Sequence, residues 1–486
     1  MLRSLALLQL AALSHAYTTF DTICSTPSTT VNYVSSANIR GTIDILWSCL
    51  FTVIACTWTV QHLNIPEQRE GRDSGWLGDI KWGLKRSFVS TKWMLATIIA
   101  PEVLLSKYWG DLEDAKLNLR KLRNFAAEDG VPWTLSHCFF ASMGGFVLRT
   151  HASGRIGKPE NVACQRVPDI ADAPTKQSTQ QELTLAIEPD TLTVPTSYDG
   201  EGSDPQKSLE NTNFPNPYHL TAGDIFNLRE SSVLTRLPYI SLDELQDRSK
   251  SDSLVRTIAV GQILWVSIQI LIRAARHLAI SQLEITVVAF ASCAVAMYGL
   301  NWYKPKGVEV PITIMQYRGE APRQVLDSLG MRSIVVSVLT NWTTIMRTFL
   351  GRPAEPKGAP TSNVFTHDAL FGLILGSLVF GGIHLAAWKF EFPTRTEQIL
   401  WWSASLWCTC FCVVFYLCAV LFGLVAVCSS FIAPVEDRLV DVGQMVLLFT
   451  YVVARLFLLV EVFRTLCFLP PDAYVATWAS NVPHIS

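Results

Sequence analysis

The sequence predicts an all-α fold: a polytopic transmembrane helix bundle of about eight passes, or seven as the alternative, with a long disordered cytosolic insertion. Of the 486 residues, 49% are hydrophobic and only 16% are charged, whereas ordinary soluble chains carry about 25% charged residues. The apolar residues form long blocks, and the polar ones gather in a few loops. The net charge of -2 provides no basic field for nucleic acid. The expected partner is therefore the lipid bilayer, with no nucleic acid.

The first 16 residues are predicted to be a secretory signal peptide. Arg3 precedes a short apolar stretch over residues 5–13, and small residues come before the expected cleavage point. An uncleaved first helix is the alternative, but so short a stretch does not cross about 30 Å of hydrocarbon. The mature chain is expected to begin near Tyr17 in the lumen. The protein should then be an integral membrane protein of the secretory pathway, in the endoplasmic reticulum or plasma membrane.

Eight apolar segments have the length and the aromatic or basic flanks of membrane passes. The second contains Pro101 and Glu102, so it either crosses the bilayer or only dips into it, and a dip leaves seven passes. The third is short, and its Gly144 and Gly145 would permit close helix packing. The segments are residues 45–63, 93–105, 133–148, 254–272, 283–303, 369–388, 400–428 and 446–463.

Two polar stretches interrupt these passes. Residues 150–253 are rich in Pro, Ser, Thr, Gln and Asp, so we expect them to be mostly disordered, with short helices at 222–228 and 241–250. Residues 334–350, within the second stretch, are expected to form an interfacial helix. The predicted divisions are a signal peptide (1–16), three passes (17–149), the insertion (150–253), a helical hairpin (254–303), a cytosolic loop (304–367) and three further passes (368–486).

The orientation follows from the positions of Lys and Arg beside the passes. Six basic residues between Arg69 and Lys92 place the first loop in the cytosol. Counting through eight passes puts the insertion and the loop 304–367 in the cytosol and both termini in the lumen. Asn341, in the acceptor sequence Asn-Trp-Thr, should therefore carry no glycan. One basic cluster, between Lys116 and Arg123, is left in the lumen by this count.

The twelve cysteines predict neither a disulfide framework nor a metal site. Ten lie in or beside apolar segments, where cysteine behaves as a small hydrophobe. Cys408, Cys410 and Cys412 alternate along the sequence, and alternate residues of a helix point too far apart to share one ion. Cys24 and Cys164 lie in polar stretches, so no local disulfide is implied for either. No metal and no cofactor are expected.

Several phrases stand out along the chain: GTIDILWSCLFTVIACTWTVQHLNIP (41–66), WTLSHCFFASMGGFVL (133–148), LDELQDRSKSD (242–252), NWYKPKGVEVP (301–311) and FGGIHLAAWKFEFPTRTEQILW (380–401). Together, and in this order, they resemble a fungal family of multi-pass membrane proteins. Departures from its pattern are small, such as Ser251 in place of Gly and Tyr303 in place of Trp. The resemblance implies a fungal source and a polytopic fold. It brings no agreed activity, although such genes can lie in natural-product clusters.

Ionisable side chains at membrane depth are the candidate functional residues, because each costs about 2.5 to 3.5 kcal/mol to insert. A histidine can move a proton near neutral pH, although a buried histidine is more often simply hydrogen-bonded between helices. Three acids lie at predicted helix starts, where the helix dipole stabilises them without any function. The catalytic candidates are His137, His384, Arg455 and Glu461, and the other intramembrane polar residues are Asp44, Glu102, Glu284 and Glu397.

Arg455 is expected to pair with an acid from another helix. It lies about nine residues into the last predicted pass, too deep for its side chain to reach an interface comfortably. Glu461 is six positions further on, about 240° around the same helix, and is therefore a poor partner. Glu102 and Glu284 remain as candidates, in a pair that is structural or lines a cavity.

Three classes of function remain open. The chain has no zinc helix, phosphate loop or nucleophile elbow, nor the paired Asp-rich motifs of membrane prenyl-transferring enzymes. A membrane enzyme or accessory factor for a hydrophobic small molecule, such as a secondary metabolite, would gather His137, His384, Arg455 and Glu461 about one cavity. A transporter or channel should have paired broken helices. A sensor or assembly protein would act through its cytosolic insertion.

Overall fold

The computed structural model describes residues 39–69, 73–151, 159–160, 217–249, 253–318, 321–329, 367–428 and 433–477. The expected signal peptide and the expected interfacial helix with Asn341 lie outside these ranges. Within them, the chain is mostly helical, and six helices are long and apolar enough to cross a membrane. Their candidate spans are Thr42–Thr59, Thr257–Ala275, Gln282–Leu300, Leu370–Lys389, Arg395–Cys418 and Met445–Phe468.

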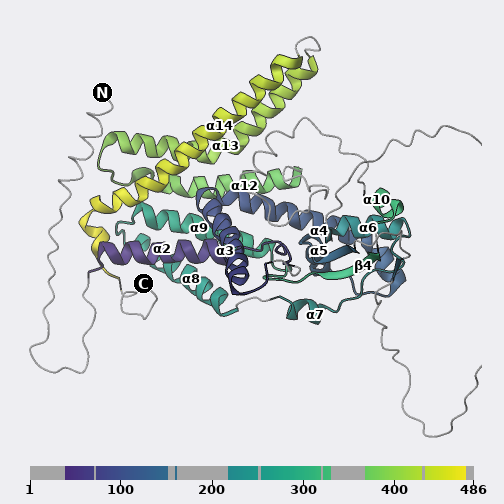
Figure 1. Ribbon diagram of the computed structural model, residues 1–486. Helices are drawn as coiled ribbons and strands as arrows, with labels where there is room; N and C mark the ends of the chain where they lie inside the picture. Colours follow the sequence, from purple (N-terminus) through teal and green to yellow (C-terminus); the bar gives the residue numbers. More distant parts are fainter. Residues whose placement is uncertain are drawn as a thin grey trace, which may run out of the picture.

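These helices form one bundle around α9 (Gln282–Leu300). A capping box begins α9, because the Ser281 hydroxyl accepts from the Glu284 amide while the Glu284 carboxylate accepts from Ser281. The helices that pack on α9 include α2 (Thr42–Thr59), α4 (Pro101–Asp129), α8 (Ser253–Ala275), α12 (His367–His384) and α14 (Ala433–Arg464). With α13 (Arg395–Cys428), α14 forms a long hairpin that projects beyond α12 (Figure 1).

The predicted second pass straddles a break between α3 (Trp76–Ile99) and α4 (Pro101–Asp129), which are bent by 111°. Pro101 begins α4, where its missing N–H costs nothing, and the preceding Ala100 has left the helix at φ -144° and ψ 75°. The 24 residues of α3 make it about 36 Å long. Because the bend exceeds a right angle, α3 runs about 13 Å against the direction of α4, so the pair turns back on itself.

Two glycines let α12 approach α4 closely. A Cβ on Gly372 would lie 2.7 Å from Cβ of Trp109, and a Cβ on Gly376 would lie 2.8 Å from Cβ of Glu102. Spaced four residues apart, they lie on one face of α12. The close contact fixes the first turn of α4, including Glu102, against α12.

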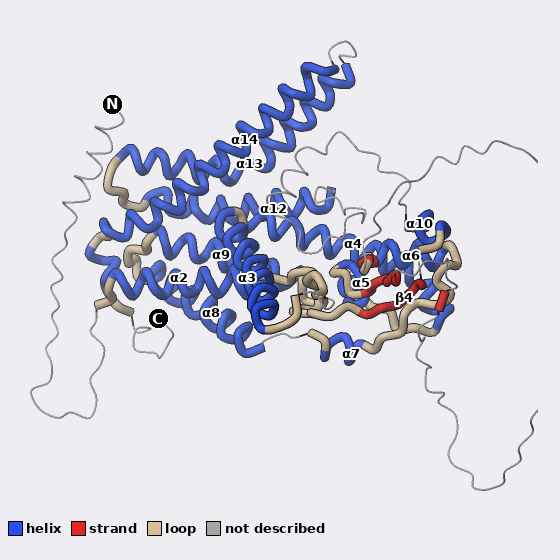
Figure 2. The backbone as a smooth tube through the Cα atoms, viewed as in Figure 1, coloured by secondary structure: helices blue, strands red, loops and turns tan. Residues whose placement is uncertain are grey.

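The all-α prediction is wrong at one end of the bundle, where a four-stranded sheet lies (Figure 2). The strand order is β2 (Pro159–Glu160), β4 (Ile312–Arg318), β1 (Phe146–His151), β3 (Tyr218–Leu220). β1 and β4 are parallel, and the other two pairs are antiparallel. The helices α5 (Leu135–Ser142), α6 (Ala222–Glu230) and α10 (Arg323–Ser328) help to close a second hydrophobic core, separate from that of the bundle. α4 extends from the bundle to this sheet subdomain (Figure 1).

The predicted third pass, residues 133–148, is likewise not a membrane helix. It consists of the eight-residue α5, a turn and the start of β1. Gly144 makes the turn with φ +85°, and its carbonyl accepts a hydrogen bond from Nδ1 of His219 at 2.8 Å. Phe146, Val147 and Leu148 are fully buried in the strand. A short strand buried on both faces has the same apolar run as a helix, which explains the wrong prediction.

The end of the predicted insertion is folded. α6 and α7 (Leu242–Asp247) occupy the two short helices expected there, and Ser241 caps α7 by accepting from the Glu244 amide at 3.1 Å. Residues 218–240 supply β3, α6 and buried side chains of the second core. The expectation of disorder is therefore wrong for residues 217–249, and residues 161–216 lie outside the described ranges.

Candidate functional site at the broken helix

The break before α4 places Glu102 against Arg455 of α14, both almost fully buried. Arg455 Nη2 donates to the two oxygens of Glu102 at 2.6 and 2.5 Å, and its Nε donates to the Tyr451 hydroxyl at 2.8 Å. Tyr451 in turn donates to Glu102. Glu102 also lies in the first turn of α4, where the helix dipole favours an acid. Arg455 is thus paired with an acid from another helix, and that acid is Glu102 rather than Glu284.

The Arg455 guanidinium also contacts an aromatic ring. Its central carbon lies 4.1 Å from the ring centroid of Phe380 on α12, within the range of a cation–π interaction. Its remaining terminal nitrogen, Nη1, has no hydrogen bond to any group in the described part of the chain. The two N–H groups of Nη1 are therefore left unused beside the ion pair.

His384, at the end of α12, is held in one orientation. Its Nδ1 lies 2.7 Å from the Phe380 carbonyl, and because a carbonyl only accepts, Nδ1 carries the proton and Nε2 is an acceptor in the neutral ring. Nε2 lies 3.3 Å from the hydroxyl of Thr286, which is also 3.0 Å from the Gln282 carbonyl. The indole of Trp401 donates to the His384 carbonyl at 3.3 Å. The acceptor atom Nε2 therefore has only a long contact, to the Thr286 hydroxyl.

His384 and Arg455 line the same cavity of about 20 Å³. That volume has room for one water or one hydroxyl group. Phe380 and Thr286 contribute to its wall, and so do apolar residues at the end of α3 and on α14, including Leu456. Leu456 is 44% exposed, so the cavity reaches the apolar outer surface of the bundle. The cavity therefore has two polar groups, His384 and Arg455, and an opening lined by apolar side chains.

His137 lies outside this site, in the sheet subdomain. Its Nε2 donates to the Ile240 carbonyl at 3.0 Å, and its Nδ1 accepts from the Thr134 amide at 3.1 Å. Burial lowers the pKa of His137, which favours the neutral ring that these two bonds require. His137 therefore caps α5 and ties it to the segment before α7.

Glu461 is also separate from the cavity, so the four residues that the membrane-enzyme hypothesis would gather about one cavity do not all lie together. It is buried near Glu397 of α13, which forms an ion pair with Arg464. Its Oε1 has no hydrogen-bond partner in the described part of the chain. Of the four candidates, only His384 and Arg455 line the cavity.

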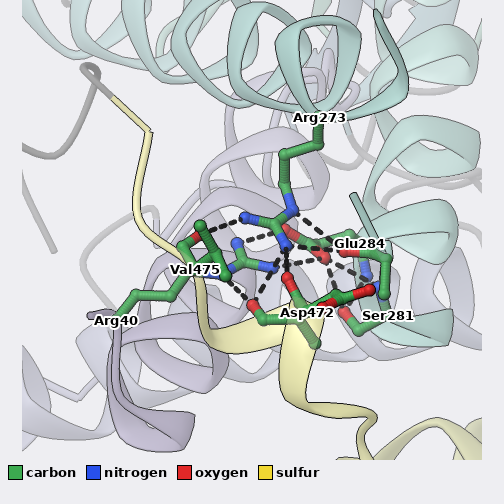
Figure 3. Close-up of polar contacts among 8 residues, drawn as sticks. Arg40, Arg273, Ser281, Glu284, Asp472 and Val475 are labelled. Atoms are coloured by element: carbon green, nitrogen blue, oxygen red, sulfur yellow. Dashed lines mark hydrogen bonds and ion pairs between the residues drawn. The ribbon is translucent and has the colours of Figure 1, made fainter. Parts of the chain in front are cut away.

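Glu284 belongs to a polar cluster at the opposite end of the bundle from the sheet, where it pairs with Arg40 at 2.6 Å (Figure 3). Arg273, which is 1% exposed, donates to the backbone carbonyls of Ala279, Asp472, Ala473 and Val475. We call Arg40, Arg273, Glu284 and the backbone of residues 472–475 the terminal clasp. An isolated β-bridge joins Ile39 and Val475 beside it. The clasp holds the start of α2 next to the segment that follows α14.

The remaining acid, Asp44, accepts from the Gly41 amide at 2.8 Å at the start of α2, so it stabilises a helix end. Sequence reasoning missed Arg40, Arg273 and Tyr451. Arg40 and Arg273 lie at segment ends, where basic residues are ordinary, and Tyr451 is one aromatic residue in an apolar run. None of them had a local pattern that distinguished it from its neighbours.

Fold and site together define a mostly helical chain with several helices apolar enough to span a membrane, and with a buried polar cluster at the break between α3 and α4. The chain belongs to a family of unknown function, DUF8562, whose model matches residues 12–167, 218–370 and 361–485. These matches pass over residues 168–217, within the polar insertion. No curated protein and no solved structure matches the chain.

Proposed function

We propose that this chain is an integral membrane protein that receives an amphipathic molecule from the bilayer at the cavity beside α3 and α14, and either acts on it or holds it for a partner. The observation that carries this proposal is the pairing of His384 and Arg455 in one cavity that reaches the outer surface at Leu456. Buried ionisable groups at membrane depth are costly and usually functional. Here they adjoin a helix break, a common feature of intramembrane sites.

The outer surface of the bundle supports insertion in a membrane. Large apolar side chains are exposed on different helices, including Leu271 on α8 and Phe449 on α14, each 68% exposed. In water, such a surface would be far larger than the apolar patches of soluble proteins. In a bilayer, it is the surface that contacts lipid.

The terminal clasp supports six spans. Ile39 and Val475 are bridged, so the start of the first span and the end of the last lie on the same side of the membrane. The number of crossings must then be even, which the six straight candidate spans satisfy. Counting the bent α3–α4 pair as a seventh crossing would separate the clasped ends. In this topology, the pair enters and leaves the bilayer on one side.

A six-span topology also explains the position of the basic cluster between Lys116 and Arg123, which an eight-pass topology leaves in the lumen. If neither residues 93–105 nor residues 133–148 cross, the stretch from Lys116 to Arg123 moves to the same side as the basic residues between Arg69 and Lys92. Both then lie in the cytosol, with the sheet subdomain, as the distribution of Lys and Arg favours. The termini remain in the lumen. A fungal source and a role in natural-product formation rest on the sequence resemblance alone.

A second candidate function is assembly of a partner on the cytosolic side. It is favoured by the sheet subdomain, whose own hydrophobic core includes residues 218–240 of the predicted insertion. A transporter is less well supported, because only one pair of helices is broken in this way within the described ranges, whereas paired breaks are typical of that class.

The first proposal is tested by what the protein retains from its own membrane. Wild type, Leu456→Trp and Leu271→Trp are extracted into polymer-bounded nanodiscs, and their small molecules are compared by mass spectrometry. Leu456→Trp should close the cavity mouth, while Leu271→Trp changes another exposed apolar position, on a helix that does not line the cavity. We expect one amphipathic species to be enriched in wild type and in Leu271→Trp and to be lost in Leu456→Trp. Identical profiles in all three proteins would refute the proposal.

A further inference from the structure

We propose that the molecule bound in this cavity is a neutral lipid alcohol whose hydroxyl lies between Arg455 and His384. The inference rests on the proposed function and specifies the chemical class of its ligand. It follows from an unused donor and an underused acceptor in one small cavity, from the depth of that cavity, and from its apolar mouth.

Arg455 and His384 require opposite hydrogen-bonding roles of a ligand that lies between them, because one donates and the other accepts. Arg455 Nη1 is a donor with no partner in the described part of the chain, and His384 Nε2 is an acceptor. The Thr286 hydroxyl has one hydrogen, so it cannot donate to both Nε2 and the Gln282 carbonyl. A hydroxyl accepts from Arg455 and donates to His384 with the same oxygen. A carbonyl or carboxylate only accepts, and an ammonium only donates.

The depth of the cavity within the bilayer favours a neutral ligand over a charged one. Arg455 is ten residues from the start of the candidate span Met445–Phe468, which places it about 15 Å from that end, near the middle of the bilayer. A charged headgroup would lose its hydration there, whereas a hydroxyl loses much less and regains two hydrogen bonds. The volume of about 20 Å³ admits a hydroxyl but no phosphate headgroup.

The mouth favours a lipid alcohol over water as the source of that hydroxyl. Ile98, Ile99, Leu456 and Leu459 line the cavity around its polar groups. An alkyl or ring system attached to the hydroxyl would leave along these side chains towards the surrounding lipid. Water has the same hydrogen-bonding chemistry but gains nothing from this apolar wall, so the test separates the two sources.

The test uses three photoreactive probes in nanodiscs that contain the full-length protein. They carry the same diazirine-bearing alkyl chain and end in a hydroxyl, in the matching methyl ether or in phosphocholine. Labelled peptides are mapped by mass spectrometry in wild type, Leu456→Trp, Leu271→Trp and His384→Phe. We expect the alcohol to label the end of α3 and residues 456–459 of α14 about tenfold more than either other probe.

The variants decide the outcome. Leu456→Trp should abolish the labelling because Leu456 lines the cavity, and Leu271→Trp should preserve it because Leu271 does not. Both positions are exposed, so neither substitution should disturb the core. His384→Phe should reduce the preference for alcohol over ether, and if that variant does not fold, the wild-type comparison of alcohol with ether still decides. Equal labelling by alcohol and ether that Leu456→Trp blocks would refute the hydroxyl inference and leave the proposed function standing. If no probe labels wild type more strongly than it labels Leu456→Trp, only water occupies the cavity. That result would refute both the hydroxyl inference and the proposed function.

Discussion

At the scale of single residues, the Glu102–Arg455 pair combines a large desolvation cost with a nearly complete set of partners. Two charges removed from water each cost several kcal/mol, which their attraction offsets only when the geometry is good. Here the carboxylate accepts from the guanidinium and from Tyr451, and Phe380 covers the guanidinium face. The pair therefore contributes little net stability while it is intact, and removing one partner is costly.

The first prediction is a strong non-additivity between these two residues. Glu102→Gln or Arg455→Met alone should destabilise the protein by roughly 3 to 5 kcal/mol, because each leaves a buried charge without its partner. The double variant should recover much of that loss. Thermal unfolding of the four proteins in one detergent measures the coupling. Losses that simply add would show that the two side chains do not interact.

A second prediction concerns Lys304, whose side chain is 2% exposed and whose Nζ lies 2.6 Å from Asp111. Burial lowers the pKa of Lys304 from 10.5 to about 8, so above pH 8 the unfolded chain binds more protons here than the folded chain. Stability from this residue should therefore rise with pH between about 8 and 10.5. Unfolding of wild type and Lys304→Met across this window measures the effect. A stability difference between them that is flat in pH would contradict it.

At the scale of elements, the contact between α12 and α4 depends on the absence of a side chain at Gly376. Gly376→Ala places a Cβ within 3 Å of the Cα and Cβ of Glu102, so α4 must shift and the substitution should cost about 1 to 3 kcal/mol. Gly382→Ala, on the same helix with open space around it, should cost little. Thermal unfolding compares the two variants. Equal effects would show that helix propensity, and not the helix contact, governs the outcome.

A fourth prediction is that residues 161–216 can be deleted without loss of folding. The family model passes over residues 168–217, and the stretch has too little apolar content for a core. The deletion must keep residues 217–249, which contribute to the sheet subdomain. Expression and thermal stability of the deleted protein should match those of wild type. A large fall in either would mean that the stretch packs on the rest of the chain.

The sequence predicted the straight apolar helices well, because a helix surrounded by lipid or other helices requires a long apolar run. It failed where the same apolar composition served a different purpose. Phe146 to Leu148 are apolar because a central strand is buried on both faces, and periodicity cannot separate that case from a helix. Pro101 marked the α3–α4 break, but the direction of the bend depends on packing against α12. The partner of Arg455 was narrowed to two acids, and only the fold could choose between them.

At the scale of the whole molecule, the bundle places its polar groups in three layers. The terminal clasp includes Glu284 at the start of α9, the Glu102–Arg455 pair lies near Cys293 in the middle of α9, and the Lys304–Asp111 pair follows the end of α9. Only the middle layer lies beside a helix break and a cavity that reaches the outer surface. In the proposed six-span topology, the α3–α4 pair forms that layer from one side of the membrane, so the proposed site depends on the pair turning back.

The most direct test of this account is therefore the sidedness of α4. Arg123→Cys, at an exposed position in the second half of α4, and Glu391→Cys, in the exposed segment between α12 and α13, are each treated with a membrane-impermeant maleimide in sealed microsomes whose cytosolic face is outward. Peptide mass spectrometry reads each position separately from the native cysteines. Six spans with a re-entrant α3–α4 pair predict labelling at position 123 and protection at position 391 until the membrane is opened. Protection at both positions would restore the eight-pass count, and labelling at 391 with protection at 123 would mean that the bent pair crosses; either result would contradict the account.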